Sequence, residues 1–333
     1  MWPISSGVIG QYPLAPLVAV DQARQSLTAT IERTLALAVQ VGAARMMRYL
    51  PTLLAEAQQQ LHQLYQFLIE PLLHHLAAYE ALVIVPDQTL HYIPFHALYD
   101  GQSYLLESYT ISYTPSATVF DYCFRHKTHN EDILLFGHDA NNLAAISLEL
   151  QMLQQLLPGA HCFSGEASTV AAFLQNAPQC GLLHLAAHAQ FRRDDPMLSS
   201  LRLADRSLTL AEIARLPLNA ELVVLNGCET GHGGLHGADL MSLAAGFLSS
   251  GVSSLVVTLW RVEDQTAAQL MPNFYQHLLA GATRADALRQ AQLALLAAGQ
   301  ASTQEEQLYS HPAFWAPFIL IGNGQSLIHF LRK

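Results

Sequence analysis

The sequence predicts a three-layer α/β/α sandwich with a mostly parallel sheet, preceded by a short helical segment. From residue 81 onward, short apolar runs bounded by turn residues alternate with stretches of helical periodicity. Runs such as 222–225 are apolar at every position, which is typical of strands whose sheet is covered by helices on both faces. A parallel sheet between two helical layers satisfies both observations.

Seven apolar runs are the predicted strands of this sheet. The order strand, helix, strand at the observed spacing favours parallel neighbours, because parallel strands need a long crossover connection. The predicted strands are 81–87, 109–113, 133–137, 181–187, 221–226, 254–259 and 318–322.

The predicted helices show apolar stripes at helical spacing. A stripe over 240–248 is followed by Gly251, which suits the C′ position just beyond a helix. Pro272 should kink or split a helix over 265–280. Another stripe consists of Ile146, Leu150, Leu153 and Leu157.

The residues before 79 are predicted to form a helical lead-in. Apolar residues between about 21 and 77 follow a helical period, and Pro51 and Pro71 mark breaks in it. We therefore divide the chain into a lead-in over 1–78 and a larger domain over 79–333. One apolar face of the lead-in consists of Leu61, Leu64, Tyr65 and Leu68.

Composition narrows the classes of partner and compartment. The chain has 333 residues, 51% of them hydrophobic, which is enough for one large or two modest cores. A net charge of −10 argues against nucleic-acid and anionic-membrane partners, because both require clustered positive charge. The four cysteines form no CxxC pair, and the chain shows neither a signal peptide nor an apolar stretch that could span a membrane. We expect a cytoplasmic protein.

Two predicted strands end in residues that can perform chemistry. His188 is the second-last residue of the run 182–189, and Cys228 comes shortly after the run 222–226. If these strands are neighbours, the two side chains face each other at one edge of the sheet, where functional groups of parallel sheets gather. An imidazole near a thiol favours the thiolate and can protonate a leaving amine. Backbone N–H groups of Gly227, Cys228 and Ala189 could then bind an oxyanion.

Other interpretations of these residues remain open. A lone cysteine that ends an apolar strand is often a buried structural thiol, and a lone strand histidine is often a core residue. Cys228, His232 and His236 could supply zinc ligands, but the glycines between them disfavour a regular helix. The same glycine-rich segment could suggest a phosphate-binding loop, but it contains no Gly-Lys-Ser/Thr. We therefore expect neither a metal nor another cofactor.

Separated motifs in a fixed order resemble one family. The sequence resembles the CHAT peptidases, relatives of the caspases and of separase. This resemblance implies a caspase-like fold, endopeptidase activity and a Cys228/His188 dyad. It divides the large domain into an N-terminal pseudo-catalytic half over 79–130 and a catalytic half over 131–333. The motifs are 84–87, 93–95, 113–117, the strand that ends at His188, 228–231, 259–264 and 311–318.

The resemblance also has implications for substrate and regulation. Similarity to separase makes Asp264 a candidate for the floor of a pocket that binds lysine or arginine, although Asp264 could instead cap a helix. Glu229, Asp194 and Asp195 are further acidic residues near the predicted site. We expect a protein substrate and an activating protein partner, in a bacterial defence or cell-death system.

The sequence departs from the family beside the predicted oxyanion hole. Ala189 stands where the family usually has glycine, and Asn226-Gly227 where it usually has Ser-Ala. If position 189 needs a positive φ, Ala189 would be strained and activity reduced. The alternative function is therefore a weak or inactive caspase-like scaffold that binds protein partners.

Overall fold

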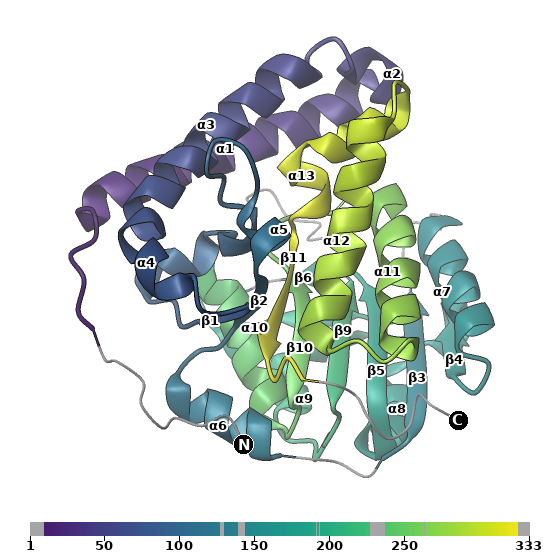
Figure 1. The fold of residues 1–333 in the computed structure, drawn as a ribbon. Coiled ribbons are helices and arrows are strands. Elements are labelled where there is room, and N and C mark those ends of the chain that lie inside the picture. Colours follow the sequence, from purple (N-terminus) through teal and green to yellow (C-terminus); the bar gives the residue numbers. More distant parts are fainter. Residues whose placement is uncertain are drawn as a thin grey trace.

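An eight-stranded sheet forms the centre of the molecule (Figure 1). The computed structural model describes residues 10–126, 130–138, 144–190, 192, 194–226, 237–262 and 264–325. In sheet order, the strands are β1 (Ala81–Ile84), β2 (Thr110–Tyr113), β11 (Phe318–Gly322), β10 (Ser254–Thr258), β9 (Leu222–Asn226), β5 (Cys180–Ala187), β3 (Asp132–His138) and β4 (His161–Ser164).

The sheet is mostly parallel, as predicted. Every pair of neighbours is parallel except β10 and β11, which are antiparallel. As a result, β1, β2 and β11 run opposite to the other five strands. The carboxyl ends of β5 and β9 therefore lie at the edge where β11 begins.

All seven predicted strands are confirmed, but the sequence analysis missed four short ones. The edge strand β4 was overlooked because its four residues include His161 and Ser164 and are not fully buried. The other three form a small antiparallel sheet after β5: β6 (Ala189–Gln190), β7 (Ser200–Arg202) and β8 (Ser207–Thr209).

Helices cover both faces of the sheet, which confirms the three layers. Successive residues of β3 show this directly. A Cβ on Gly137 would touch Leu150 of α7 (Ala144–Leu156), whereas the ring of Phe136 lies against Phe173 of α8 (Val170–Asn176) on the opposite face. Beside α7 lie α11 (Asp264–Leu279) and α12 (Arg284–Ala301), and behind the sheet lie α9 (Leu210–Ile213) and α10 (Gly237–Ser249) (Figure 1).

The helix ends mostly follow the sequence signals. Helix α10 ends at Ser249, and Gly251 has a φ of 101°, which confirms its C′ role. Pro272 lies inside α11 without splitting it. Pro51 lies in the first turn of α3 (Leu50–Leu68), where its missing N–H costs no hydrogen bond. Pro71 lies in the short 3₁₀ helix that follows α3.

The helical lead-in packs onto the same hydrophobic core. Helix α1 (Leu17–Val41) and α3 lie side by side, and α1 also contacts α13 (Pro312–Trp315) (Figure 1). The predicted face of α3 is buried at all four positions. The boundary between 78 and 79 stays a prediction. The shorter helices are α2 (Ala43–Met46), α4 (Leu73–Leu76), α5 (Leu105–Ser108) and α6 (Ala117–Arg125).

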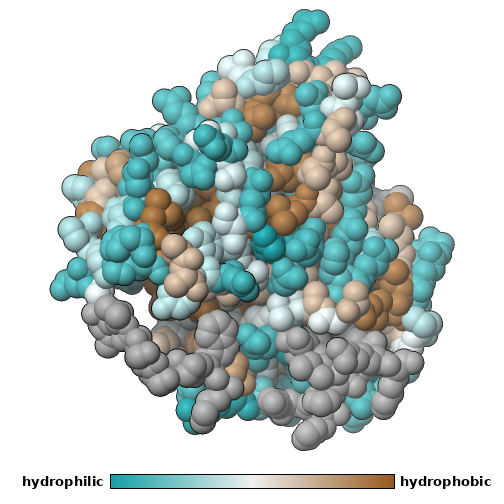
Figure 2. All heavy atoms as spheres, in the orientation of Figure 1, coloured by the Kyte–Doolittle hydropathy of each residue, from teal (hydrophilic) through white to brown (hydrophobic). Residues whose placement is uncertain are grey.

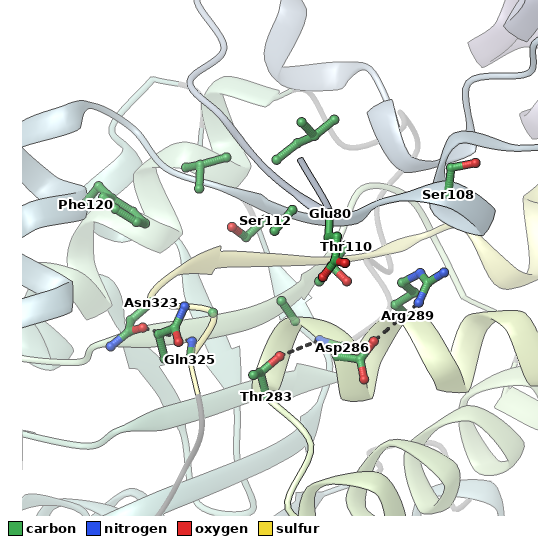
Figure 3. Close-up of a pocket in the computed structure, with 15 residues that line it drawn as sticks. Glu80, Ser108, Thr110, Ser112, Phe120, Thr283, Asp286, Arg289, Asn323 and Gln325 are labelled. Carbon is green, nitrogen blue, oxygen red and sulfur yellow. Dashed lines mark hydrogen bonds and ion pairs between the residues drawn. The ribbon is translucent and has the colours of Figure 1, made fainter. Parts of the chain in front are cut away.

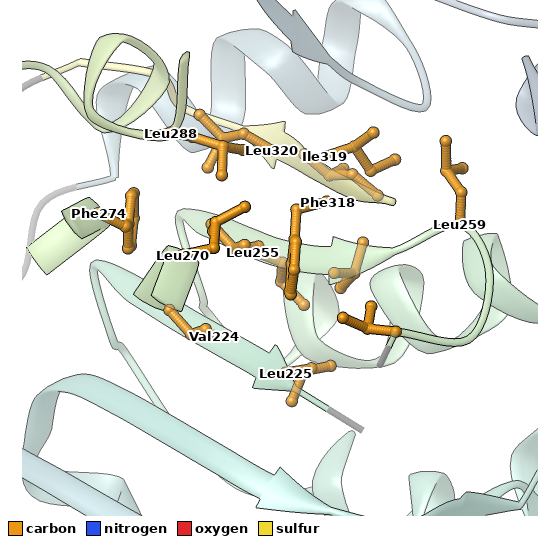
Figure 4. Packing of buried hydrophobic residues seen from close by; sticks show 14 of the residues in the cluster. Val224, Leu225, Leu255, Leu259, Leu270, Phe274, Leu288, Phe318, Ile319 and Leu320 are labelled. Atoms are coloured by element: carbon orange, nitrogen blue, oxygen red, sulfur yellow. The ribbon is translucent and has the colours of Figure 1, made fainter. Parts of the chain in front are cut away.

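Buried side chains pack between the central strands and the front helices. Figure 4 shows Leu255 of β10 and Leu320 of β11 close to Leu270 and Phe274 of α11, and Leu288 of α12. All five side chains are at most 3% exposed. Burial of each such side chain contributes about 1.5–3 kcal/mol, so this contact fixes the front layer on the sheet.

The surface is mostly hydrophilic on the face shown in Figure 2, where hydrophobic residues form small separate areas. Within the part of the chain that the structure describes, no helix is both long and apolar enough to cross a bilayer.

Candidate active site

The two strands that carry the predicted chemistry are neighbours. Strands β5 and β9 are parallel and paired from Leu182↔Leu222 to Ala186↔Asn226. All eight residues of β5 are buried, so the strand is fixed within the sheet up to its end. His188 directly follows β5, and Asn226 is the last residue of β9. The expectation that the two strand ends share one edge is thereby confirmed.

The small sheet fixes the backbone around His188. The carbonyl oxygen of His188 accepts a hydrogen bond from the N–H of Arg202, at 2.8 Å, and Ala189 pairs with Leu201. The His188 side chain is half-buried. Among the described residues, positive φ angles at non-glycine positions occur only at two sites far from here, so Ala189 adopts an ordinary extended backbone. The strain considered for Ala189 does not arise.

The other half of the predicted dyad falls on residues that the structure does not describe. Gly227, Cys228 and Glu229 lie outside the described residues, as do His232 and His236 of the zinc alternative. Asp264 is the first residue of α11, but its side chain lies outside the described part. The Cys228/His188 contact and the roles of Gly227, Glu229 and Asp264 therefore stay predictions.

The three described cysteines are unsuited to be nucleophiles. Burial raises the pKa of Cys123 to about 11 and that of Cys180 to about 12. Burial also raises the pKa of the half-buried Cys162. Since the thiolate is the reactive form, none of these thiols is activated at neutral pH.

The two described acidic candidates already have local partners. Arg192 donates from Nε to Oδ1 of Asp194, at 2.8 Å, and this interaction lowers the pKa of Asp194 to about 2. Oδ1 of Asp195 accepts from the N–H of Met197, at 3.1 Å, and caps a short 3₁₀ helix. Both follow β6 on the chain; Asp194 is paired with a cation, whereas Asp195 makes a helix-capping hydrogen bond.

A buried polar cluster lies beneath the ends of β5 and β9. Glu149 of α7, His184 of β5 and Tyr275 of α11 are buried, and Asn226 is half-buried. Nδ2 of Asn226 donates to both carboxylate oxygens of Glu149, at 2.9 and 2.7 Å. Nε2 of His184 lies 3.1 Å from Oε1 of the same carboxylate, and its Nδ1 lies 3.1 Å from the Tyr275 hydroxyl. The sequence analysis missed this cluster.

Two of the motifs meet where β11 begins. Nε1 of Trp260 donates to the carbonyl oxygen of Ala313, at 2.9 Å, and the N–H of Leu259 donates to the carbonyl oxygen of Pro317, at 2.8 Å. Because β10 and β9 are parallel neighbours, this contact lies at the edge that His188 also faces. The contact links segments more than 50 residues apart in the chain.

A cavity among the described residues belongs to another region of the molecule. It has a volume of about 600 Å³ and is lined by β1, β2, α6, the start of α12 and the residues after β11 (Figure 3). Thr283 and Arg289 both contact Asp286 on its wall, at 3.1 and 3.4 Å. Strands β10 and β11 separate this cavity from β9, so it is not part of the candidate active site.

A metal centre has no support among the described side chains. In the described part of the chain, no three histidine, cysteine, aspartate or glutamate side chains lie close enough together to hold an ion. The residues of the zinc alternative lie outside this described part.

Comparison with solved structures defines the class of fold. The structure of the Saccharomyces cerevisiae separase–securin complex at 3.0 Å matches with a TM-score of 0.52 and 11% identity, over 93% of this chain and 22% of that chain. A 2.6 Å structure of the same complex gives the same TM-score at 10% identity. The fold is therefore the caspase-like α/β/α sandwich that was predicted.

The family follows from the sequence match. The CHAT domain model matches residues 58–323, so the chain belongs to the CHAT domain family. Tetratricopeptide repeat protein 28 of Mus musculus is 23% identical over 338 aligned residues, and that of Homo sapiens 24% identical over 341. Each match covers 81% of this chain but only 13% of the relative, so this chain corresponds to a small part of those proteins.

Proposed function

We propose that this chain is a cysteine endopeptidase in which Cys228 is the nucleophile and His188 the general acid and base. The register of β5 and β9 supports this proposal most strongly. Ala186 of β5 is paired with Asn226 of β9. His188 comes two residues after Ala186, and Cys228 comes two residues after Asn226. Parallel neighbours carry such residues to one edge of a sheet.

The proposed reaction is acyl transfer through sulfur. His188 takes the thiol proton of Cys228, and the thiolate forms a bond to the carbonyl carbon of the scissile amide. The resulting oxyanion is stabilised by backbone N–H groups, for which Gly227, Cys228 and Ala189 are the candidates. The C–N bond then breaks as His188 protonates the leaving amine. A water molecule, deprotonated by His188, hydrolyses the thioester and regenerates the thiol.

We further propose cleavage after a basic residue. Asp264 and Glu229 are the acidic candidates that could recognise it, because Asp194 is already neutralised by Arg192 and Asp195 caps a helix. A carboxylate binds a lysine or arginine side chain through charge-assisted hydrogen bonds.

A protein partner is part of the proposal. The curated relatives are much longer than this chain, and the solved neighbour is a complex of two proteins. Both are consistent with a peptidase controlled by an attached domain or a bound partner. We place it in the cytoplasm, because the four cysteines form no CxxC pair. A bacterial defence or cell-death system is the proposed setting, and it rests on the family resemblance. The net charge of −10 disfavours nucleic acid as a partner.

The test is hydrolysis of a library of internally quenched peptides. We expect Cys228→Ala and His188→Ala to reduce kcat/KM by at least about 1,000-fold, as removal of either member of a catalytic unit does. Cys162→Ser is the matched control, because it removes a half-buried thiol away from the site, and it should leave kcat/KM unchanged. Asp264→Ala should weaken the preference for lysine and arginine.

Two results would contradict these assignments. Hydrolysis that survives Cys228→Ala removes the mechanism, and a basic preference that persists in Asp264→Ala removes the pocket assignment. A chain that binds partner proteins but hydrolyses no peptide, with or without them, would favour the scaffold alternative.

A further inference from the structure

Glu149 is a buried carboxylate that touches both strands of the candidate site. It is 3% exposed and lies between α7 and the sheet. Its two oxygens accept from Nδ2 of Asn226, the last residue of β9. One of them also lies 3.1 Å from Nε2 of His184, which precedes His188 by four residues on β5. The contact with His184 is electrostatic rather than an aligned hydrogen bond.

Stability alone does not explain this arrangement. Removal of a carboxylate from water is costly, and the partners around it regain only part of that cost. Replacement of buried charged or polar groups by packed apolar side chains is often neutral or stabilising. Core positions around it, such as Leu150 and Leu153 of the same helix, are apolar. A specific geometry is what the polar contacts provide and an apolar cluster would not.

Tyr275 completes the cluster from the other front helix. Burial raises its pKa well above the ordinary value, and the charge of Glu149 adds to this, so the hydroxyl keeps its proton. When this hydroxyl donates to Nδ1 of His184, the ring proton of a neutral imidazole lies on Nε2, toward Glu149. Helices α7 and α11 thus hold the two strands through one chain of polar contacts.

We propose that Glu149 is a positioning residue that clamps the carboxyl ends of β5 and β9 together and so sets the distance between His188 and Cys228. This inference rests on the proposed function. The clamp acts at Asn226 on β9 and at His184 on β5, and it touches neither substrate nor reacting atoms. Asn226 stands where the family usually has serine, and its side-chain amide donates to the carboxylate of Glu149. The clamp therefore gives this departure from the family a structural role.

The test measures the rate at which iodoacetamide alkylates Cys228 in the folded protein at a series of pH values. Peptide mass mapping identifies the alkylated cysteine. Glu149→Gln presents an amide donor to the amide of Asn226, and Asn226→Asp places two carboxylates within about 3 Å of each other. Each change should slow alkylation at neutral pH by about 10-fold, because a displaced imidazole no longer favours the thiolate, which is the reactive form. The midpoint of the pH profile should rise toward that of an unassisted thiol.

The combined variant Glu149→Gln/Asn226→Asp should recover most of the rate. In that pair, the amide of position 149 donates to the new carboxylate, and its oxygen still faces Nε2 of His184. Glu221→Gln is the matched control: it changes a buried carboxylate at the opposite end of β9, where it binds Arg284, and it should lower stability without slowing alkylation. Tyr275→Phe, which leaves Glu149 in place, should slow alkylation by about 3-fold.

The outcomes separate the clamp from the proposed function. A double variant no faster than the slower single variant, or equal slowing by Glu221→Gln, overturns the clamp. An unchanged alkylation rate in Glu149→Gln also overturns the clamp. If that variant fails to fold, unchanged alkylation rates in Tyr275→Phe and Asn226→Asp overturn it instead. Peptide hydrolysis is measured in parallel: its absence from the unsubstituted chain would remove the peptidase, whereas the clamp is decided by alkylation alone.

Discussion

Acid should destabilise the protein through His311, a residue of the 311–318 motif. His311 is buried, and burial lowers its pKa to about 4, although a hydrogen bond to the backbone of Leu53 partly opposes this. Its Nδ1 accepts from the N–H of Ala313, at 3.0 Å, and caps α13. A proton on Nδ1 would therefore break the cap. Nε2 lies 3.5 Å from Oγ1 of Thr34 in α1.

The magnitude follows from proton linkage. Below about pH 6.5, the unfolded chain binds a proton at position 311 that the native chain does not bind until about pH 4. The contribution of neutral His311 to the free energy of unfolding is therefore complete above about pH 6.5 and is lost as the pH falls to about 4. The total loss is about 3 kcal/mol, with a slope of about 1.3 kcal/mol per pH unit near pH 5. His96, whose pKa burial also lowers to about 4, adds a similar slope.

Urea unfolding between pH 7 and pH 4.5 measures this slope. In His311→Asn, the amide oxygen can still accept from Ala313, because asparagine is a favoured N-cap residue, but it does not titrate. The slope should fall by about 1.3 kcal/mol per pH unit near pH 5. His161→Asn, at an exposed position on β4, should leave it unchanged. Equal slopes for His311→Asn and the unsubstituted chain would refute the reasoning.

Two further predictions concern stability. Glu221→Ala should lower the free energy of unfolding by about 3–5 kcal/mol, because it leaves the charge of Arg284 buried without its partner. Asp121→Ala breaks an exposed ion pair and should cost less than about 1 kcal/mol; equal midpoints of the two variants in thermal unfolding would contradict this. Gly299→Ala should destabilise by about 1–3 kcal/mol although alanine favours helices, because its Cβ would lie 2.1 Å from the backbone N of Ser310; a stabilised variant in the same assay would show that this contact yields freely.

Periodicity was sufficient to predict the layers but not the details at their edges. Continuous apolar runs such as 222–225 identify buried strands because both faces are covered. The direction of β11 was not predictable, since an apolar run reads the same in either direction. The strands β6 to β8 were missed because they have only two or three residues each, too few for an alternating pattern to show.

The candidate site was predictable only where residues adjoin strand ends. His188 and Cys228 could be paired from sequence because parallel neighbours end at one edge. Glu149 could not be paired with Asn226, because the contact joins residues 77 positions apart on different elements. One signal was available: Glu149 is three residues after Ile146, on the apolar side of its helix, where a charged side chain requires a partner.

The way α1 lies over α13 matters for anyone who prepares a shorter version of this protein. The family match begins at residue 58, inside α3, and leaves out all of α1. A fragment cut there would lose the first two turns of α3 and uncover His311 to water. The N–H of Ala313 donates to His311, and its carbonyl oxygen accepts from the indole of Trp260, so exposure of His311 would weaken this link to Trp260. Such a fragment would keep every motif of the family resemblance and still lack the helix that covers His311, so an inactive short form would not contradict the proposed peptidase activity.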